Sequence, residues 1–340
     1  MQVHLTDSNV AEHLRNRGLL DAGQELSVEK AGDGNINWVR RLRLHPSGES
    51  MVVKQAREAL ERFPQYRAST ERIVFESRYY ETAAPFDPGG VCPQVRYFDA
   101  EARLLVLEDL GPAERLDHAL ARGAEVAPAA AGLGGFLGRV HAGTRDPALA
   151  ERFANDEMRR LHGDHIFHLP FREDFGLAPA LAERAAAVRA DAELVRLADA
   201  AYARYLEPRG ALVHGDVQAG NVLLAGRGPV LLDAEIAHAG DPAFDVGTFL
   251  AHLLLPAIAM GAAQRARPAV DAAWSAYVSA HGAGAPPFAE CARYAGLELM
   301  RRTIGAARVA AVEDEAAALR VVEAAERLLR TPPGGTRGLF

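Results

Sequence analysis

The segment from residue 214 to residue 235 constrains the fold of this chain more than any other. It begins with His214-Gly215-Asp216, and Asn221 follows the aspartate five residues later. Two apolar runs, 222–224 and 230–232, come next, and the glycine-containing stretch between them has the length of a hairpin loop. A hairpin here folds Asp233, which follows the second run, back beside Asn221. The sequence therefore predicts two short antiparallel strands that bring these polar side chains together.

The spacing H-x-D-x-x-x-x-N with a later acid is typical of a phosphoryl-transfer centre. In that chemistry an aspartate orients or deprotonates the attacking hydroxyl, so we predict that Asp216 is the catalytic residue. Asn221 and Asp233 are predicted to bind Mg²⁺, a hard cation that prefers oxygen ligands. Glu235 lies on the same side of an extended segment as Asp233, which predicts a second carboxylate for the metal, directly or through water. The alternative is that both aspartates are ordinary turn residues at strand ends.

A glycine loop, Gly32-Asp33-Gly34-Asn35, precedes two strands that are expected near the N-terminus. The first strand alternates over 36–44, a turn follows at 46–48, and the second strand ends in Lys54. A Rossmann fingerprint would place its glycines after a strand, and the P-loop sequence is absent. The order fits a kinase flap, whose amides cover the ATP phosphates while a strand lysine reaches them. We therefore predict ATP binding by Gly32, Asp33, Gly34, Asn35 and Lys54, with an ordinary turn as the alternative.

Two further segments fit an ATP site. A helix is expected over 70–82, and Glu76 shares its apolar face, where a carboxylate is costly unless it is paired. Lys54 is the expected partner, and a solvated Glu76 is the alternative. Residues 104–107 read as a buried strand that leads to the crossing between two lobes, where the backbone of Glu108 to Leu110 is expected to meet the adenine edge.

Polar residues on two later helices extend the candidate site. Asp241 before a proline is a good helix start, which places Asp245 in the first turn, where it is expected to brace the catalytic loop. His214 and Asp241 are also assigned to support of that loop. Arg301 shares a helix face with apolar residues and no obvious acid, which indicates a site for an anion or polyhydroxyl ligand. The alternative is that Arg301-Arg302 is a solvated stripe.

The remaining histidines favour structural interpretations. His141 is expected to be a packed helix histidine, because no acid or nucleophile lies near it in the sequence. His162, His165 and His168 have helical spacing, but the aromatic neighbours and Pro170 make a loop or short turn an equal alternative, and a metal site is not favoured.

Composition limits the remaining possibilities. The chain of 340 residues is 49% hydrophobic, which is enough for a large core in two lobes. Its net charge of −7 argues against nucleic acid as a partner. Cys92 and Cys291 are the only cysteines and indicate neither a disulfide framework nor a zinc site, which fits a cytoplasmic protein. No signal peptide is expected. The apolar stretch 246–263 contains His252 and Pro256, which predicts a buried helix and a turn rather than a membrane span.

These motifs resemble a known family. His214-Gly215-Asp216-Val217-Gln218-Ala219-Gly220-Asn221 and residues 240–245 are similar to those of the aminoglycoside phosphotransferase and choline kinase superfamily, and within it to the 5-methylthioribose kinases. The similarity includes 32–37, 53–56, 107–110, 233–235 and 300–305. It implies a protein-kinase-like fold, ATP and Mg²⁺ as cofactors, metal binding by Asp233 and Glu235, and sugar contacts from Arg301 and Arg302. Methylthioribose kinases usually continue His-Gly-Asp with Leu-His-Thr-Gly-Ser, so the change at 217–221 leaves the acceptor open.

The expected architecture is α+β with two lobes. Residues 1–109 are expected to form a small antiparallel-sheet nucleotide-binding lobe, 110–330 a larger helical lobe with the catalytic loop and acceptor site, and 331–340 a loose tail. The predicted activity is ATP-dependent phosphorylation of a hydroxyl on a small polyhydroxylated acceptor, such as a methylthioribose-like sugar. An antibiotic phosphotransferase and a catalytically silent nucleotide-binding module are the alternatives. No nucleic acid or membrane partner is expected, and a homodimer is left open.

Overall fold

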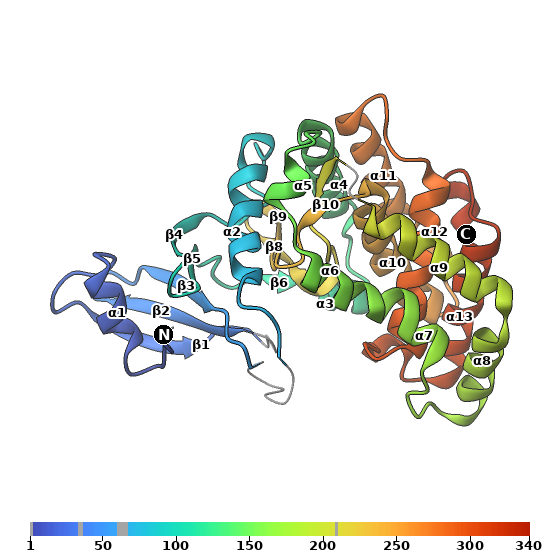
Figure 1. The fold of residues 1–340 in the computed structure, drawn as a ribbon, viewed down its shortest axis with the longest axis horizontal. Coiled ribbons are helices and arrows are strands. Elements are labelled where there is room, and N and C mark those ends of the chain that lie inside the picture. The colour runs from blue at the N-terminus through green and yellow to red at the C-terminus, as the bar shows by residue number, and fades with distance from the viewer. Residues whose placement is uncertain (1–2, 33–36, 60–66, 208–209) are drawn as a thin grey trace. The chain divides into compact units, whose positions relative to one another are not determined.

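The computed structural model describes residues 3–32, 37–59, 67–207 and 210–340. The chain divides into two compact units, one formed by residues 1–82 and 93–112 and the other by residues 83–92 and 113–340. The segment 83–92 therefore belongs to the second unit, although the sequence assigned it to the first lobe. Figure 1 labels most elements of both units.

The first unit is built on one antiparallel sheet of five strands in the order β1-β2-β3-β5-β4 (Figure 1). The alternation of Trp38, Leu42 and Leu44 predicted the second strand, and these side chains are buried with Val10 and Leu14 of the short helix α1. The elements of this unit are α1 Val10–Asn16, β1 Glu25–Lys30, β2 Trp38–His45, β3 Ser50–Gln55, α2 Arg72–Ala83, β4 Val95–Asp99 and β5 Leu104–Glu108.

The second unit is mostly helical. Its helices before the catalytic loop are α3 Leu116–Ala121, α4 Ala127–Gly143, α5 Leu149–Arg152, α6 Asp156–Gly163, α7 Leu169–Arg172, α8 Pro179–Ala190 and α9 Ala192–Leu206. Those after it are α10 Pro242–Ala259, α11 Arg267–His281, α12 Phe288–Ile304 and α13 Glu315–Arg330. A π-helical turn at Asp164–His168 joins α6 to α7, so the three spaced histidines lie in a helical segment.

Short strands frame the catalytic loop in this unit. β7 Ala211–Val213 pairs with β10 His238–Gly240. β8 Val222–Ala225 and β9 Gly228–Leu231 form the predicted hairpin, and β6 Glu114–Arg115 pairs with β8. The predicted catalytic loop, residues 214–221, therefore leaves a two-stranded sheet and enters a three-stranded one, which fixes both of its ends.

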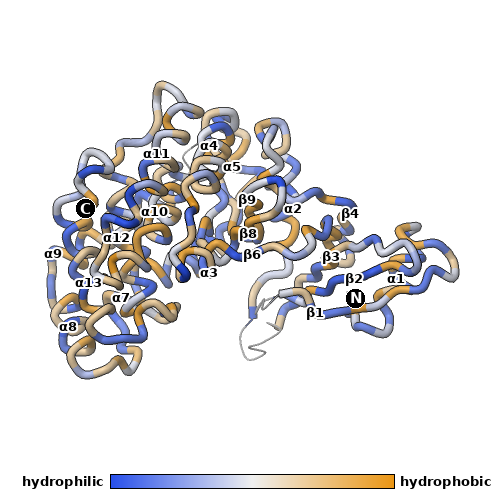
Figure 2. The backbone as a smooth tube through the Cα atoms, turned by 180° about the vertical axis from the view of Figure 1, so that it is seen from behind, coloured by the Kyte–Doolittle hydropathy of each residue, from blue (hydrophilic) through white to orange (hydrophobic). Residues whose placement is uncertain are grey.

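Helix α10 is the buried centre of the helical unit. Figure 2 shows its mainly apolar course, and 89% of its residues are buried. It is the one helix of the described residues that is long and apolar enough to cross a membrane, and core helices pass the same test. α10 packs on α12, and α4 packs on α11. A Cβ at Gly134 of α4 would lie 2.2 Å from the carbonyl oxygen of Ala273, so this close approach of α4 and α11 requires glycine.

The last ten residues differ from the loose tail that the sequence predicted. Leu339 is 2% exposed, and the guanidinium of Arg327 in α13 donates to its carbonyl oxygen at 2.9 Å. The guanidinium of Arg267 lies over the ring of Phe340. The apolar pair Leu339 and Phe340 explains the difference, because it supplies a packing surface that the preceding prolines and glycines lack.

Candidate active site

The predicted catalytic loop is held by the first turn of α10. The carboxylate of Asp245 accepts hydrogen bonds from the backbone N–H groups of His214 at 2.7 Å and Gly215 at 2.9 Å. Gly215 has φ +85°, and a Cβ there would lie 2.7 Å from the carbonyl oxygen of Ile236, so only glycine fits. The loop thus makes its sharp turn at Gly215 while Asp245 satisfies two of its amides.

His141 of α4 holds Asp245 from the other side. Its Nε2 lies 3.2 Å from the Asp245 carboxylate, and its Nδ1 lies 3.1 Å from the hydroxyl of Tyr277. Burial alone would raise the pKa of Asp245, but the hydrogen bond and charge of His141 and the bonds from the loop keep that pKa below its ordinary value. The sequence predicted a packed histidine here and missed this contact, because 104 residues separate the two side chains.

Asp216 presents one of its carboxylate oxygens to the loop and the other away from it. Oδ2 accepts from the side-chain amides of Gln218 at 2.8 Å and Asn221 at 2.9 Å. Oδ1 is buried and has no hydrogen-bond partner among the described residues. Burial raises the pKa of Asp216, but the positive charges of Arg301 and Arg302 lower it by more, so it stays below its ordinary value. Asp216 is therefore ionised at neutral pH and has a free oxygen for a hydroxyl proton.

His162 of α6 is the functional candidate that the sequence did not identify. Its Nε2 lies 3.7 Å from Oδ1 of Asp216, beyond hydrogen-bond distance, and neither ring nitrogen has a partner among the described residues. Burial, with the positive charge of Arg301, lowers the pKa of His162 to about 3, so the ring is neutral. Among the residues that the structure describes, no group of three or more His, Cys, Asp or Glu is placed to hold a metal.

The predicted arginine pair is buried beside the catalytic loop. Arg301 and Arg302 are 8% and 7% exposed, which excludes a solvated stripe. Both donate to Glu298, one helical turn earlier, at 3.2 Å and 2.6 Å. The expectation that Arg301 has no acidic neighbour on its helix face is therefore wrong. Because two arginines share it, the pKa of Glu298 is held well below its ordinary value in spite of its burial, which acts in the opposite direction.

The predicted metal residues lie on the hairpin. The backbone N–H of Leu232 donates to the carbonyl oxygen of Asn221 at 2.8 Å, which brings the start of β8 close to the residue before Asp233. The amide nitrogen of Asn221 faces Asp216, so its Oδ1 remains to meet a cation. Asp233 has φ +64° and the chain turns after it, so the extended segment predicted to place Glu235 on the same side is not present. Asn155 instead donates to the carbonyl oxygen of Glu235 at 2.9 Å.

His214 and Asp241 lie beside the loop and at the start of α10. The buried ring of His214 accepts from the N–H of Asp216 at 3.2 Å, and burial lowers its pKa. Asp241 caps α10 by accepting from the N–H of Ala243 at 3.1 Å, and it pairs with Arg204. Asp241 thus fixes the helix end that carries Asp245.

The predicted nucleotide residues lie in the first unit. Lys54 of β3 is 4% exposed, and its Nζ lies 2.8 Å from Glu76 of α2, which also accepts from the hydroxyl of Tyr80. Glu76 is therefore paired rather than solvated. Gly32 follows β1 with φ +68°, whereas Asp33, Gly34 and Asn35 lie outside the described residues.

The backbone N–H groups of Glu108 and Leu110, at the end of β5 and just after it, differ in whether they are already hydrogen-bonded. The N–H of Glu108 donates to the carbonyl oxygen of Gln94 at 2.9 Å. The N–H of Leu110 has no acceptor among the described residues. Of these two donors, only that of Leu110 is therefore open to an adenine ring.

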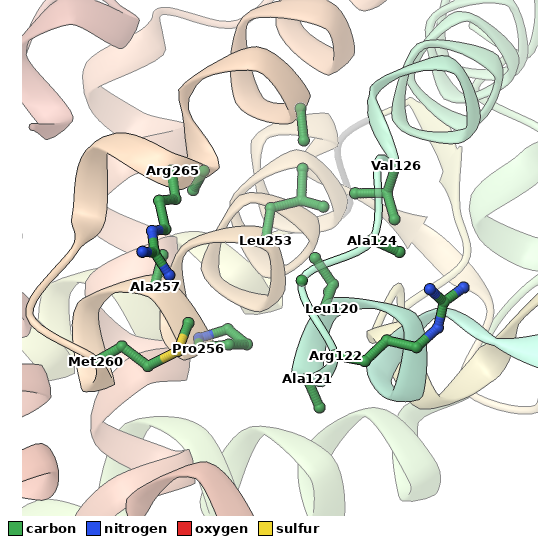
Figure 3. A pocket seen from close by; sticks show the side chains of 13 residues that line it. Leu120, Ala121, Arg122, Ala124, Val126, Leu253, Pro256, Ala257, Met260 and Arg265 are labelled. Carbon is green, nitrogen blue, oxygen red and sulfur yellow. The ribbon is translucent and has the colours of Figure 1, made fainter.

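A hollow of about 430 Å³ lies elsewhere in the helical unit (Figure 3). Its walls are mainly apolar side chains, including Leu120, Val126, Leu253 and Met260, with Arg122 and Arg265 among them. None of the lining residues belongs to the predicted site, and we assign no role to this hollow.

Comparisons with known proteins identify the family and the fold. The model of the phosphotransferase enzyme family matches residues 27–284. A methylthioribose kinase of Bacillus velezensis is 28% identical over 91% of this chain and 86% of its own length, and one of Yersinia pseudotuberculosis is 29% identical over 91% and 87%. A solved choline kinase of Streptococcus pneumoniae matches with a TM-score of 0.52 at 16% identity, over 95% of this chain and 98% of its own. A putative fructosamine-3-kinase of Thermobifida fusca also gives 0.52, at 18% identity, over 96% and 100%. The predicted α+β protein-kinase-like fold is confirmed.

Proposed function

Because the chain belongs to the phosphotransferase enzyme family, we propose that it transfers the γ-phosphate of ATP to a hydroxyl of a small, uncharged, polyhydroxylated acceptor, a methylthioribose-like sugar. Three buried polar groups without partners among the described residues carry this proposal. They are Oδ1 of Asp216, the ring of His162 and Nε of Arg301. The charge of Arg301 acts on both other groups, so the three belong to one environment.

The chemistry of these groups suits hydroxyls. The ionised oxygen of Asp216 accepts a proton, Arg301 donates, and a neutral histidine ring offers one donor and one acceptor. Buried polar groups that are left unpaired reject ligands that cannot satisfy them, which favours a ligand with several hydroxyls. The two arginines and the neutral ring offer little to a cationic antibiotic, which needs carboxylates. This environment supports the sugar over an aminoglycoside as acceptor.

In the proposed reaction Asp216 takes the proton of the acceptor hydroxyl. The hydroxyl oxygen forms a bond to the γ-phosphorus as the bond from that phosphorus to the bridging oxygen breaks, and ADP leaves. Lys54, held by Glu76, binds the phosphates, and the N–H of Leu110 with the carbonyl of Glu108 binds the adenine. The intact set of Lys54, Asp216 and Asn221 is inconsistent with a catalytically silent module.

The residues of the hairpin suit a hard divalent cation. The amide nitrogen of Asn221 is used by Asp216, which leaves its amide oxygen for a cation, and Asp233 supplies a carboxylate, which is the donor chemistry that Mg²⁺ prefers. When bound, Mg²⁺ neutralises the charge that develops on the phosphate oxygens. Asn221 and Asp233 are the proposed ligands, and Glu235 is proposed as a second carboxylate that acts through water. Cys92 and Cys291 are free cysteines rather than a disulfide among the described residues, which is usual in the reducing cytoplasm. We therefore propose a cytoplasmic enzyme.

An acceptor panel tests the proposal. We expect ATP turnover to be fastest with 5-methylthioribose, slower with ribose, and absent with choline, homoserine and an aminoglycoside, because only the sugars present several neutral hydroxyls. ADP release and phosphate transfer to the acceptor would be measured together. Phosphorylation of choline or the aminoglycoside without turnover of any sugar would contradict the proposed acceptor, although not the phosphotransferase chemistry.

Replacing Lys54 by Met tests the nucleotide role. The loss of charge-assisted hydrogen bonds to phosphate is expected to lower kcat/KM for ATP by about 10- to 100-fold. The same change leaves the buried Glu76 without its cation and is expected to cost about 3–5 kcal/mol of stability. Steady-state kinetics and thermal unfolding measure the two effects. Lys30→Met, at the other lysine of the chain, is the matched control and should change neither.

A further inference from the structure

Gln218 lies where the chain departs from the motif of the methylthioribose kinases, between Asp216 and Asn221. Its side chain makes two hydrogen bonds. The amide nitrogen donates to Oδ2 of Asp216 at 2.8 Å, and the amide oxygen accepts from Arg302 at 2.7 Å. A guanidinium can only donate and an ionised carboxylate can only accept, so the two partners fix the orientation of the amide. Gln218 is therefore the one side chain of the described residues that hydrogen-bonds to both Asp216 and Arg302.

The bonds of Gln218 continue into the helical core. Nε of Arg302 donates to Glu298 at 2.6 Å, and Glu298 also lies 3.1 Å from Nε2 of His252 in α10. Arg302, Glu298 and His252 are each less than 10% exposed. This relay runs from the catalytic carboxylate to two packed helices, so the position of Gln218 is set by buried groups rather than by solvent.

We propose that Gln218 is a positioning residue. It links Asp216 to Arg302 and so holds the carboxylate with Oδ1 facing the acceptor. Asn221 and Gln218 both donate to Oδ2, so moving the carboxylate out of this position would break two hydrogen bonds. Arg302 thereby acts through Gln218 on the loop, and Arg301 is the arginine of the pair that remains for the sugar. The positioning role rests on the proposed function of Asp216.

Two variants separate positioning from a structural role. Gln218→Met keeps the length of the side chain and removes both hydrogen bonds, so we expect kcat to fall about 10- to 100-fold with an unchanged KM for ATP. Gln218→Glu keeps the contact with Arg302 but sets a second carboxylate against Oδ2. Like charges repel, so Oδ2 loses this hydrogen bond while Arg302 keeps its partner, and kcat should fall as it does in Gln218→Met. Gln264→Glu, an exposed substitution in the same unit, is the matched control and should leave kcat unchanged.

A readout without turnover keeps this test independent of the acceptor. The carboxyl ¹³C resonance of Asp216 at a fixed neutral pH, assigned by its loss in Asp216→Asn, should shift in Gln218→Met, which removes one hydrogen bond to Oδ2, and should stay in place in Gln264→Glu. Wild-type kcat in a folded Gln218→Met or in Gln218→Glu would overturn the positioning role. If the wild type phosphorylates no sugar but the Asp216 resonance shifts in Gln218→Met, the proposed acceptor is overturned and the role of Gln218 is retained.

Discussion

Asp216→Asn is expected to lower kcat by about 10²- to 10⁴-fold, the usual contribution of a general base. The substitution keeps the shape of the side chain but removes the ionised oxygen that has no hydrogen-bond partner among the described residues. The KM for ATP should stay nearly constant, because the proposed nucleotide contacts lie at Lys54 and Leu110. Rapid-quench or coupled assays of ADP release with 5-methylthioribose measure the effect.

A control separates chemistry from folding in that experiment. Asp199 is an exposed carboxylate of the same unit, paired with Arg172 at 2.9 Å. Asp199→Asn should retain full turnover, and thermal unfolding should show that Asp216→Asn remains folded. Full turnover by Asp216→Asn would remove Asp216 from the proposed mechanism.

Acidification is expected to destabilise the helical unit well before its carboxylates are protonated. Burial lowers the pKa of both His162 and His238 to about 3, against an ordinary value of 6.5. Between these values the unfolded chain binds protons that the folded chain does not. Stability is therefore complete above about pH 6.5 and is lost progressively as the pH falls toward 3. At pH 5 each histidine accounts for about 2 kcal/mol, or about 4 kcal/mol together.

Urea unfolding at pH 7, 6 and 5 measures this loss. Trp274 lies in the helical unit, so its fluorescence in a Trp38→Phe background follows that unit. His162→Gln should show about half of the loss that these two histidines give the parent protein, because one of them no longer binds a proton on unfolding. Equal unfolding free energies at pH 7 and pH 5 would mean that the buried rings are protonated in the folded protein.

Local patterns predicted much of the fold. Alternation of apolar residues before Lys54 indicated β2 and β3, and two apolar runs around a glycine loop indicated the β8–β9 hairpin. The capping signal at Asp241 and Pro242 indicated the start of α10. Each of these signals depends on residues that are close in the sequence, which is why it can be read there.

Most contacts that build the candidate site join residues that are far apart in the sequence. His162 lies 54 positions before Asp216, and His141 is 104 positions before Asp245, so no spacing rule links either pair. The contact between Glu298 and Arg301 could have been predicted from the sequence, because Glu298 precedes Arg301 by one helical turn. The extended backbone expected from Asp233 to Glu235 was wrong, because Asp233 adopts a left-handed conformation, which is uncommon for residues other than glycine.

The support of the catalytic loop by Asp245 has a consequence for motion during turnover. Opening the loop would break two charge-assisted hydrogen bonds and expose a carboxylate on the most buried helix of the unit. Local opening is cheapest where few buried contacts are lost, so this loop is a poor hinge. The backbone of residues 214–216 is therefore expected to stay in place during turnover. The movements that admit substrates and release products occur in other segments of the chain.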